Sequence, residues 1–155
     1  MHRVQASIDL KALQHNFQIA RSRAKGSKVA AIIKANAYGH GLEQAASALT
    51  EADLFGVTDV YEAVALEQAA TGKPILVLQG MMQTDDLHLV AEHNFQLVIH
   101  SSEQLAQIDE TLSRLTLKQP LTLWLKMDSG MGRLGLSPHG FARTYKALLG
   151  RPYTD

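Results

Sequence analysis

The chain contains no cysteine, which excludes disulfides, thiolate nucleophiles and cysteine-based metal sites. Long apolar runs are also missing, since none approaches the roughly 18 residues that a membrane span needs. The first residues lack the apolar core of a signal peptide. We therefore expect a cytoplasmic protein that has no membrane partner.

Net charge is absent as well, because 15 Lys and Arg residues balance 15 Asp and Glu residues. The basic residues are scattered singly, so nothing indicates a nucleic-acid partner. Seven histidines are dispersed without a His-x-x-x-His pair, and we expect no metal site. With 46% hydrophobic residues in 155, the composition is that of one globular domain with a sizeable core.

Short apolar runs alternate with helix-like segments along the whole chain. The runs begin near residues 29, 54, 75, 95 and 121. Helical patterns cover 9–24, 42–52, 59–72, 84–94 and 101–113, and another helix begins at Ser137-Pro138. Asp59 with Glu62, and Ser101 with Gln104, form capping-box patterns at two of the helix starts.

This rhythm predicts an α/β fold. Three of the runs are continuously apolar, which is typical of parallel strands that are covered on both faces. An open doubly wound sheet and part of a (β/α)8 barrel both fit, and the pattern alone does not separate them. A full barrel needs about 250 residues, so on that interpretation the chain holds about five of eight strands.

Reactive side chains gather where the first apolar run ends. Chemistry in α/β folds collects at the carboxyl ends of strands, and Lys34 directly follows the run Val29–Ile33. Desolvation there favours the neutral amine that a Schiff base requires. Tyr38 can offer its hydroxyl to a phosphate, while Gly39 and Gly41 let backbone amides approach it. The alternative is a snorkelling lysine before an ordinary glycine-rich turn.

A second group follows the fifth run, in Lys126–Gly135. Arg133 lies in a glycine-rich loop and is a planar donor suited to a carboxylate or a phenolate oxygen. Lys126 and Asp128 are close to it in sequence. The alternative here is a Lys–Asp–Arg cluster at the surface, which contributes little to stability.

Four stretches resemble bacterial alanine racemases. Ile33–Gly41, read as IKANAYGHG, resembles their pyridoxal-phosphate attachment motif, and Leu125–Gly135 resembles their second signature. Ile8–Asn16 resembles the opening helix of the family, and Phe55–Val57 with Glu62-Ala63 matches a third stretch. The resemblance covers essentially residues 3 to about 149, with both main motifs in the family's order and spacing.

The resemblance implies the N-terminal part of a pyridoxal-phosphate-binding (β/α)8 TIM-type barrel. In the family a mainly β domain follows, and two subunits form a head-to-tail dimer. We therefore expect residues 1–155 to be an incomplete barrel domain without the C-terminal β domain, and the full-length protein to be a homodimer. The implied function is interconversion of L-alanine and D-alanine, which supplies D-alanine for peptidoglycan.

The resemblance also implies a role for each matching residue. Lys34 would hold pyridoxal 5'-phosphate as an internal aldimine and act as the base on the D face of the substrate's α-carbon. Tyr38 would bind the cofactor phosphate. Arg133 would contact the phenolic oxygen and the substrate carboxylate, with Met131 also in the substrate site. Lys126 matches a lysine that family members carry carbamylated, which would turn a cation into an anion able to orient Arg133.

A second function remains open at this stage. A non-catalytic pyridoxal-phosphate-binding or homeostasis module of the same barrel superfamily would share the cofactor lysine. The detail of Tyr38–Gly41 and of Met131–Arg133 favours the racemase, whereas the lack of a second domain favours the module.

The missing C-terminal domain leads to a prediction about activity. In the family the second catalytic base is a tyrosine of that domain, so we expect the 155 residues alone to racemise alanine slowly or not at all. Exchange of the alanine α-proton in D2O measures this. A rate near that of a full-length racemase would contradict the prediction.

Overall fold

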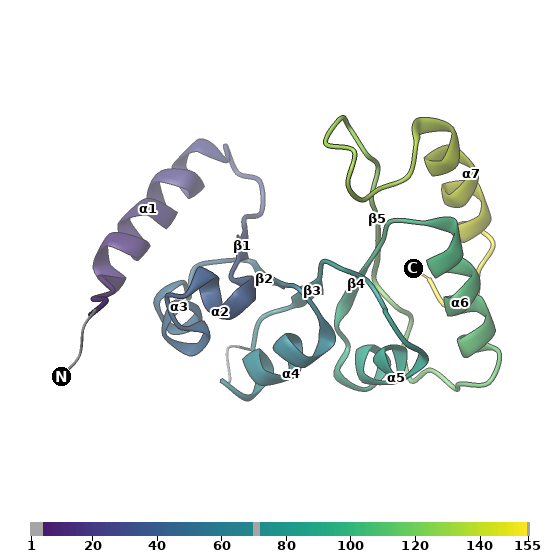
Figure 1. Ribbon diagram of the computed structural model, residues 1–155, viewed down its shortest axis with the longest axis horizontal. Helices are drawn as coiled ribbons and strands as arrows, with labels where there is room; N and C mark the ends of the chain where they lie inside the picture. The colour runs from purple at the N-terminus through teal and green to yellow at the C-terminus, as the bar shows by residue number, and fades with distance from the viewer. Residues whose placement is uncertain (1–4, 70–71, 155) are drawn as a thin grey trace.

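The computed structural model describes residues 5–69 and 72–154. Within these ranges five parallel strands form one sheet, and helices connect them (Figure 1). The strands are β1 (Ala30–Ile32), β2 (Leu54–Val57), β3 (Ile75–Val77), β4 (Gln96–Ile99) and β5 (Leu123–Leu125). The helices are α1 (Leu10–Arg23), α2 (Lys34–Tyr38), α3 (Leu42–Ala48), α4 (Val60–Gln68), α5 (Thr84–His93), α6 (Ser102–Leu112) and α7 (Pro138–Leu148).

The order of the strands distinguishes the two architectures that the sequence left open. Each strand pairs with the next one along the chain, in the order β1-β2-β3-β4-β5. A doubly wound sheet reverses its order at a switch point, and no reversal occurs among the described strands. A sheet of consecutive parallel strands with its helices on one face is the arrangement of a (β/α)8 barrel. The expected fold class is confirmed.

The two faces of the sheet differ in how they are covered. One face packs against the helices, in a core that includes Phe55, Leu97 and Ile99. The other face carries a smaller cluster made only of strand residues and of Leu78, which follows β3. Ile32 and Trp124 lie on this inner face by alternation and remain 39% and 47% exposed. The expectation of strands covered on both faces is therefore only partly confirmed, because opposite strands cover the inner face in a closed barrel.

The helix starts follow the capping signals, with one correction. Asp59 accepts hydrogen bonds from the backbone N–H groups of Tyr61 and Glu62, at 3.0 and 2.9 Å. The reciprocal half of the predicted capping box reaches one residue further back. Glu62 accepts from the N–H of Thr58 at 2.8 Å, because the strand turns directly into the helix and this N–H points at its first turn. In α6, Gln104 accepts in the same way from the N–H of His100, at 3.0 Å.

Some boundaries are shorter than predicted. Helix α3 ends at Ala48 rather than near residue 52, and β5 covers three residues of the apolar run 121–127. No helix in the described ranges is long and apolar enough to cross a membrane.

An ion pair fixes the start of β1. Asp53 accepts from the backbone N–H of Val29 at 2.7 Å and from Arg21 of α1 at 2.9 Å. These two contacts lower the pKa of Asp53 below its usual value. The carboxylate thus joins α1 to the strand that leads to Lys34.

At the other edge of the sheet, residues 153–154 lie beside the beginning of the β5 run. The N–H of Leu121 donates to the carbonyl of Tyr153 at 2.8 Å, and Leu121 forms a parallel bridge with Thr154. Asp109 of α6 accepts from Arg151 at 2.5 Å and from the Tyr153 hydroxyl. Burial and the neighbouring Asp109 raise the pKa of the Tyr153 phenol. This cluster holds the chain in the position of a sixth strand.

The raised phenol pKa leads to a prediction about alkaline stability. The unfolded chain releases the Tyr153 proton near the ordinary tyrosine pKa of about 10, whereas the folded chain retains it to higher pH. The stability that the buried phenol contributes is therefore complete below that pH and is lost as pH rises above it. We expect Tyr153→Phe to lower the free energy of unfolding at neutral pH by about 1 kcal/mol and to make it decline less steeply at alkaline pH.

Thermal unfolding followed by circular dichroism between neutral and alkaline pH measures this effect. Tyr145→Phe is the control, because Tyr145 is 52% exposed. A control variant whose alkaline profile flattens as much as that of Tyr153→Phe would contradict the assignment.

Candidate functional site

Strand β1 leads directly to Lys34 at the carboxyl end of the sheet. Ala31 and Ile33 are buried in the outer core, so alternation puts Ile32 on the inner face, and Lys34 begins the turn that follows the strand. The N–H of Ile33 donates to the carbonyl of Gly56 at 2.9 Å, which keeps the chain in the sheet up to the lysine. The Lys34 side chain is half-buried.

Strand β5 places Lys126 in the corresponding way. Trp124 pairs in register with Val98 on the inner face, and Lys126 lies two residues further along the same face. The N–H of Lys126 donates to the carbonyl of Ile99 at 2.8 Å. Pairing thus continues to the lysine, and both lysines lie at the same end of the sheet.

The same register brings in a residue that the sequence analysis missed. His100 follows Val98 by two residues and neighbours Lys126 across the β4–β5 pair. Its Nε2 lies 3.0 Å from the carbonyl oxygen of Gln79, and this nitrogen carries the hydrogen because a carbonyl can only accept. The sequence alone could have identified His100 as a neighbour of Lys126 only if the register of the strands had been known.

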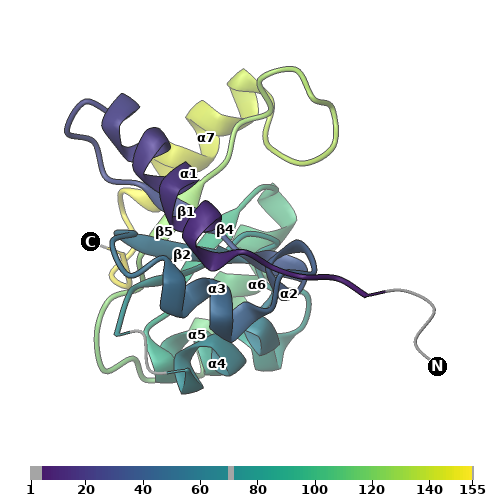
Figure 2. The same cartoon turned by 90° about the vertical axis from the view of Figure 1, so that its left-hand side faces the viewer.

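The two motifs share one end of the sheet without touching. Strands β1 and β5 are four steps apart, and steps of about 4.8 Å separate them by roughly 19 Å along the sheet. Curvature of the sheet shortens the direct distance. The α2 turn and the loop after β5 lie on the same side, to the right in Figure 2. A ligand that contacts both motifs must lie between them, over the inner face.

The α2 segment is one turn of left-handed helix. Ala35, Asn36, Ala37 and Tyr38 all have φ between 50° and 55°. For L-residues this conformation costs roughly 1–2 kcal/mol per residue. The sequence predicted only a glycine-rich loop here, and two alanines among the four residues give no signal for a left-handed turn.

Contacts around the turn compensate for this cost. Ala37 is only 5% exposed, and the Asn36 side chain accepts from the N–H of Leu42 at 2.8 Å. His40 donates from Nδ1 to the carbonyl of Ala37 at 2.8 Å. Tyr38 is left 61% exposed, and its hydroxyl makes no hydrogen bond within the described ranges. The turn leaves this hydroxyl accessible to a ligand.

Asp128 gives the loop after β5 its shape. It accepts from the N–H groups of Gly130 at 2.9 Å and Gly132 at 3.1 Å, and these bonds lower its pKa. A Cβ at Gly135 would lie 2.5 Å from the backbone nitrogen of Asp128, so only glycine fits there.

The surface cluster of Lys126, Asp128 and Arg133 is not formed. Across residues 5–69 and 72–154, the ion pairs involve none of these three residues. Asp128 is engaged by the loop backbone instead. Arg133 is exposed and Met131 is 79% exposed, so both side chains are available to a ligand.

These side chains fit an anionic aldehyde such as pyridoxal phosphate. Lys34 offers an amine, Tyr38 a hydroxyl and Arg133 a guanidinium, and none has a side-chain partner among the described residues. A Cβ at Gly39 would meet nothing within 4 Å, so the space beside the turn is open. The hydroxyl can donate to a phosphate and the guanidinium to a phenolate oxygen, and the amine can attack a carbonyl carbon.

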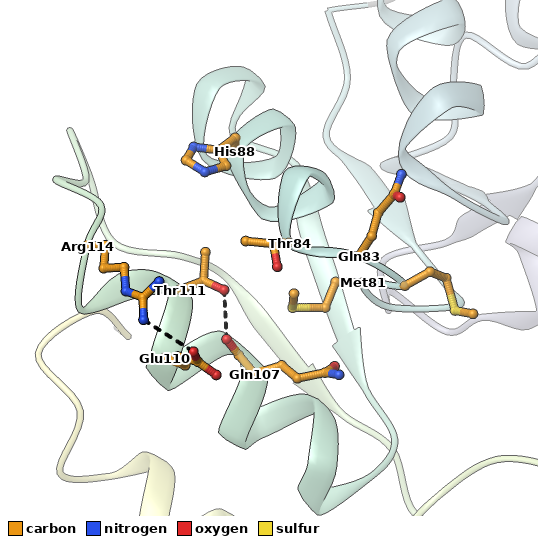
Figure 3. Close-up of a pocket in the computed structure, with 9 residues that line it drawn as sticks. Met81, Gln83, Thr84, His88, Gln107, Glu110, Thr111 and Arg114 are labelled. Atoms are coloured by element: carbon orange, nitrogen blue, oxygen red, sulfur yellow. Dashed lines mark hydrogen bonds and ion pairs between the residues drawn. The ribbon is translucent and has the colours of Figure 1, made fainter.

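A cavity lies away from these residues, between α5 and α6 (Figure 3). This cleft of about 390 Å³ is lined by residues that include Met81, His88 and Arg114. Arg114 pairs with Glu110 at 3.4 Å, and both side chains face solvent. The cleft contains none of the predicted site residues, and we do not assign a catalytic role to it. In the described part of the chain, no three His, Asp or Glu residues are grouped as a metal site would require.

Comparison with known proteins agrees with this geometry. Residues 8–154 match the family model "Alanine racemase, N-terminal domain". Alanine racemase of Xanthomonas axonopodis pv. citri is 46% identical over 153 residues, which are 98% of this chain and 40% of that protein. Alanine racemase of Pectobacterium carotovorum is 47% identical over 133 residues, 86% of this chain and 36% of that protein. The chain thus spans less than half the length of these relatives.

Solved structures show the same relationship. The biosynthetic alanine racemase of Pseudomonas aeruginosa has a TM-score of 0.88 at 34% identity, over 96% of this chain and 40% of that one. A histidine racemase of Leuconostoc mesenteroides has a TM-score of 0.82 at 27% identity, over 94% of this chain and 39% of that one. With both racemase motifs at one end of a barrel-type sheet, this chain belongs to the alanine racemase family and corresponds to its N-terminal domain.

Proposed function

We propose that the protein containing this chain interconverts L-alanine and D-alanine with pyridoxal 5'-phosphate as cofactor. One observation carries the proposal: the side chains of Lys34, Tyr38 and Arg133 are unpaired in the described structure, at the same end of the sheet. Alanine is favoured as substrate because relatives named alanine racemase are 43–47% identical to the chain.

Each residue then has a defined task. Lys34 would hold the cofactor through its amine and, once the substrate's amine has taken its place and freed it, would take or return the α-proton on one face of the substrate. Tyr38 would donate its hydroxyl to the phosphate. Arg133 would donate to the phenolic oxygen and to the substrate carboxylate, beside Met131. When bound, the cofactor would supply stabilisation for the electron pair that the departing α-proton leaves behind.

A proton must also be delivered to the opposite face of the α-carbon. Lys34 approaches from one side only, so racemisation requires a second group on the other side. In our proposal this group comes from the partner subunit of a homodimer. A cytoplasmic location and a role in supplying D-alanine for peptidoglycan belong to the same proposal.

Lys126 is proposed to be carbamylated. Its side chain is half-buried, and the nearby Asp128 is engaged by backbone N–H groups. Addition of CO2 to the neutral amine forms an N–C bond, and loss of a proton leaves an anion. That anion would orient the guanidinium of Arg133 by paired hydrogen bonds.

The cofactor assignment predicts a single attachment site. Borohydride reduction of protein loaded with pyridoxal phosphate is expected to leave a pyridoxyl group on Lys34, located by peptide mass mapping. Lys34→Ala should lose this adduct, whereas the exposed Lys118→Ala should keep it. A wild-type protein without an adduct, or with its adduct on another lysine, would refute the assignment. Cofactor binding without exchange of the alanine α-proton would favour the non-catalytic module.

The modification of Lys126 predicts dependence on CO2. Activity should fall in CO2-depleted buffer and recover with bicarbonate, and mass spectrometry should find a carbamate on Lys126. Lys126→Ala is expected to lower kcat/KM for alanine at least about tenfold, because Arg133 loses its orienting anion. Lys146→Ala, on the exposed side of α7, serves as control. Wild-type kcat/KM in Lys126→Ala would show that no anion is needed there.

A further inference from the structure

Glu62, in the first turn of α4, bridges two loops at the carboxyl end of the sheet. One carboxylate oxygen accepts from the N–H of Thr58 at 2.8 Å, directly after β2. The other accepts from the N–H of Asn36 at 3.4 Å, in the turn after Lys34. Within the described ranges, Glu62 is the one side chain distant in sequence that hydrogen-bonds to the backbone of residues 34–38.

The turn needs such a contact from outside. Ala35 and Ala37 have no intrinsic preference for a left-handed conformation, and the right-handed alternative would redirect both Lys34 and Tyr38. The contact is long, at 3.4 Å, and its acceptor is a carboxylate oxygen. It acts on Asn36, at the centre of the turn.

Capping of α4 accounts for only one of the two Glu62 contacts. Asp59 caps the helix by accepting from the N–H groups of Tyr61 and Glu62. Glu62 completes the cap by accepting from the N–H of Thr58, as Gln104 does at α6. The second oxygen of Glu62 reaches beyond the helix to Asn36, and this contact has no counterpart in capping.

We propose that Glu62 is a positioning residue for the cofactor lysine. Its carboxylate holds the left-handed turn against the end of β2. The turn then sets the directions of the Lys34 and Tyr38 side chains. The inference rests on the proposed function, because it assigns to the turn the task of presenting those two side chains to the cofactor.

Glu62→Gln tests the idea with little change of shape. Glutamine keeps one acceptor oxygen, which we expect to remain on Thr58, and turns an NH2 group toward the Asn36 N–H. Affinity for pyridoxal phosphate should fall about tenfold. Amide hydrogen exchange of the peptide spanning residues 34–41, measured without cofactor, should become several-fold faster.

Asp59→Asn is the matched control, because it removes a charge from the same helix start without touching α2. It should keep the cap, because Asn caps a helix about as well as Asp, and lower the melting temperature only slightly through loss of the charge at the helix N-terminus. Both the affinity and the exchange rate should stay within about twofold of wild type. Wild-type values in Glu62→Gln, or equal changes in Asp59→Asn, would overturn the inference. If wild-type protein forms no adduct on Lys34, the proposed function fails, while the cofactor-free exchange measurement still decides whether Glu62 holds the turn.

Discussion

Parallel pairing of consecutive strands is the constraint on which the rest of the structure depends. Each strand must point the same way as its neighbour, so every loop that follows a strand emerges at one end of the sheet. The lysine motif after β1 and the arginine motif after β5 are therefore brought to that end together. Helices on the outer face supply the buried core, and the inner face and its carboxyl end remain for a ligand.

The left-handed turn after Lys34 carries a local cost in conformational energy at the candidate site. Four successive residues adopt a conformation that L-amino acids avoid, and the cost is of the order of several kcal/mol. Burial of Ala37, the Asn36 and His40 side-chain bonds and the Glu62 carboxylate surround the turn. Strain that is held from several sides is typical of functional sites, where a rigid geometry is needed. Lys34 thus directly precedes a turn that several contacts hold in place.

The loop after β5 is ordered by different means. Asp128 accepts hydrogen bonds from the backbone N–H groups of two glycines, and the backbone of Asp128 comes so close to Gly135 that no side chain fits there. Because the carboxylate is engaged in this way, it does not neutralise Arg133. The positive charge that remains on this guanidinium suits an anionic ligand. An aspartate that looks in the sequence like a counter-charge therefore serves as a loop scaffold.

The features that depend on local sequence signals could be predicted from the sequence. The caps at Asp59 and Ser137, the apolar runs and the two motifs all depend on neighbours in sequence, and the structure has them close to the expected positions. The left-handed turn, the contact of Glu62 with Asn36 and the position of His100 beside Lys126 depend on pairing between distant segments, and they were missed. Periodicity also could not choose between a doubly wound sheet and a barrel, because both use the same βα units.

The sequence by itself determined the α/β class, the identity of the candidate site residues and the family resemblance, since these reside in residue types and their spacing. Tertiary structure alone decided the order of the strands, the end of the sheet at which both lysines lie and the handedness of the turn after Lys34. The physical reason is that strand register and backbone strain are set by contacts between segments far apart along the chain. No local pattern in IKANAYGHG records those contacts.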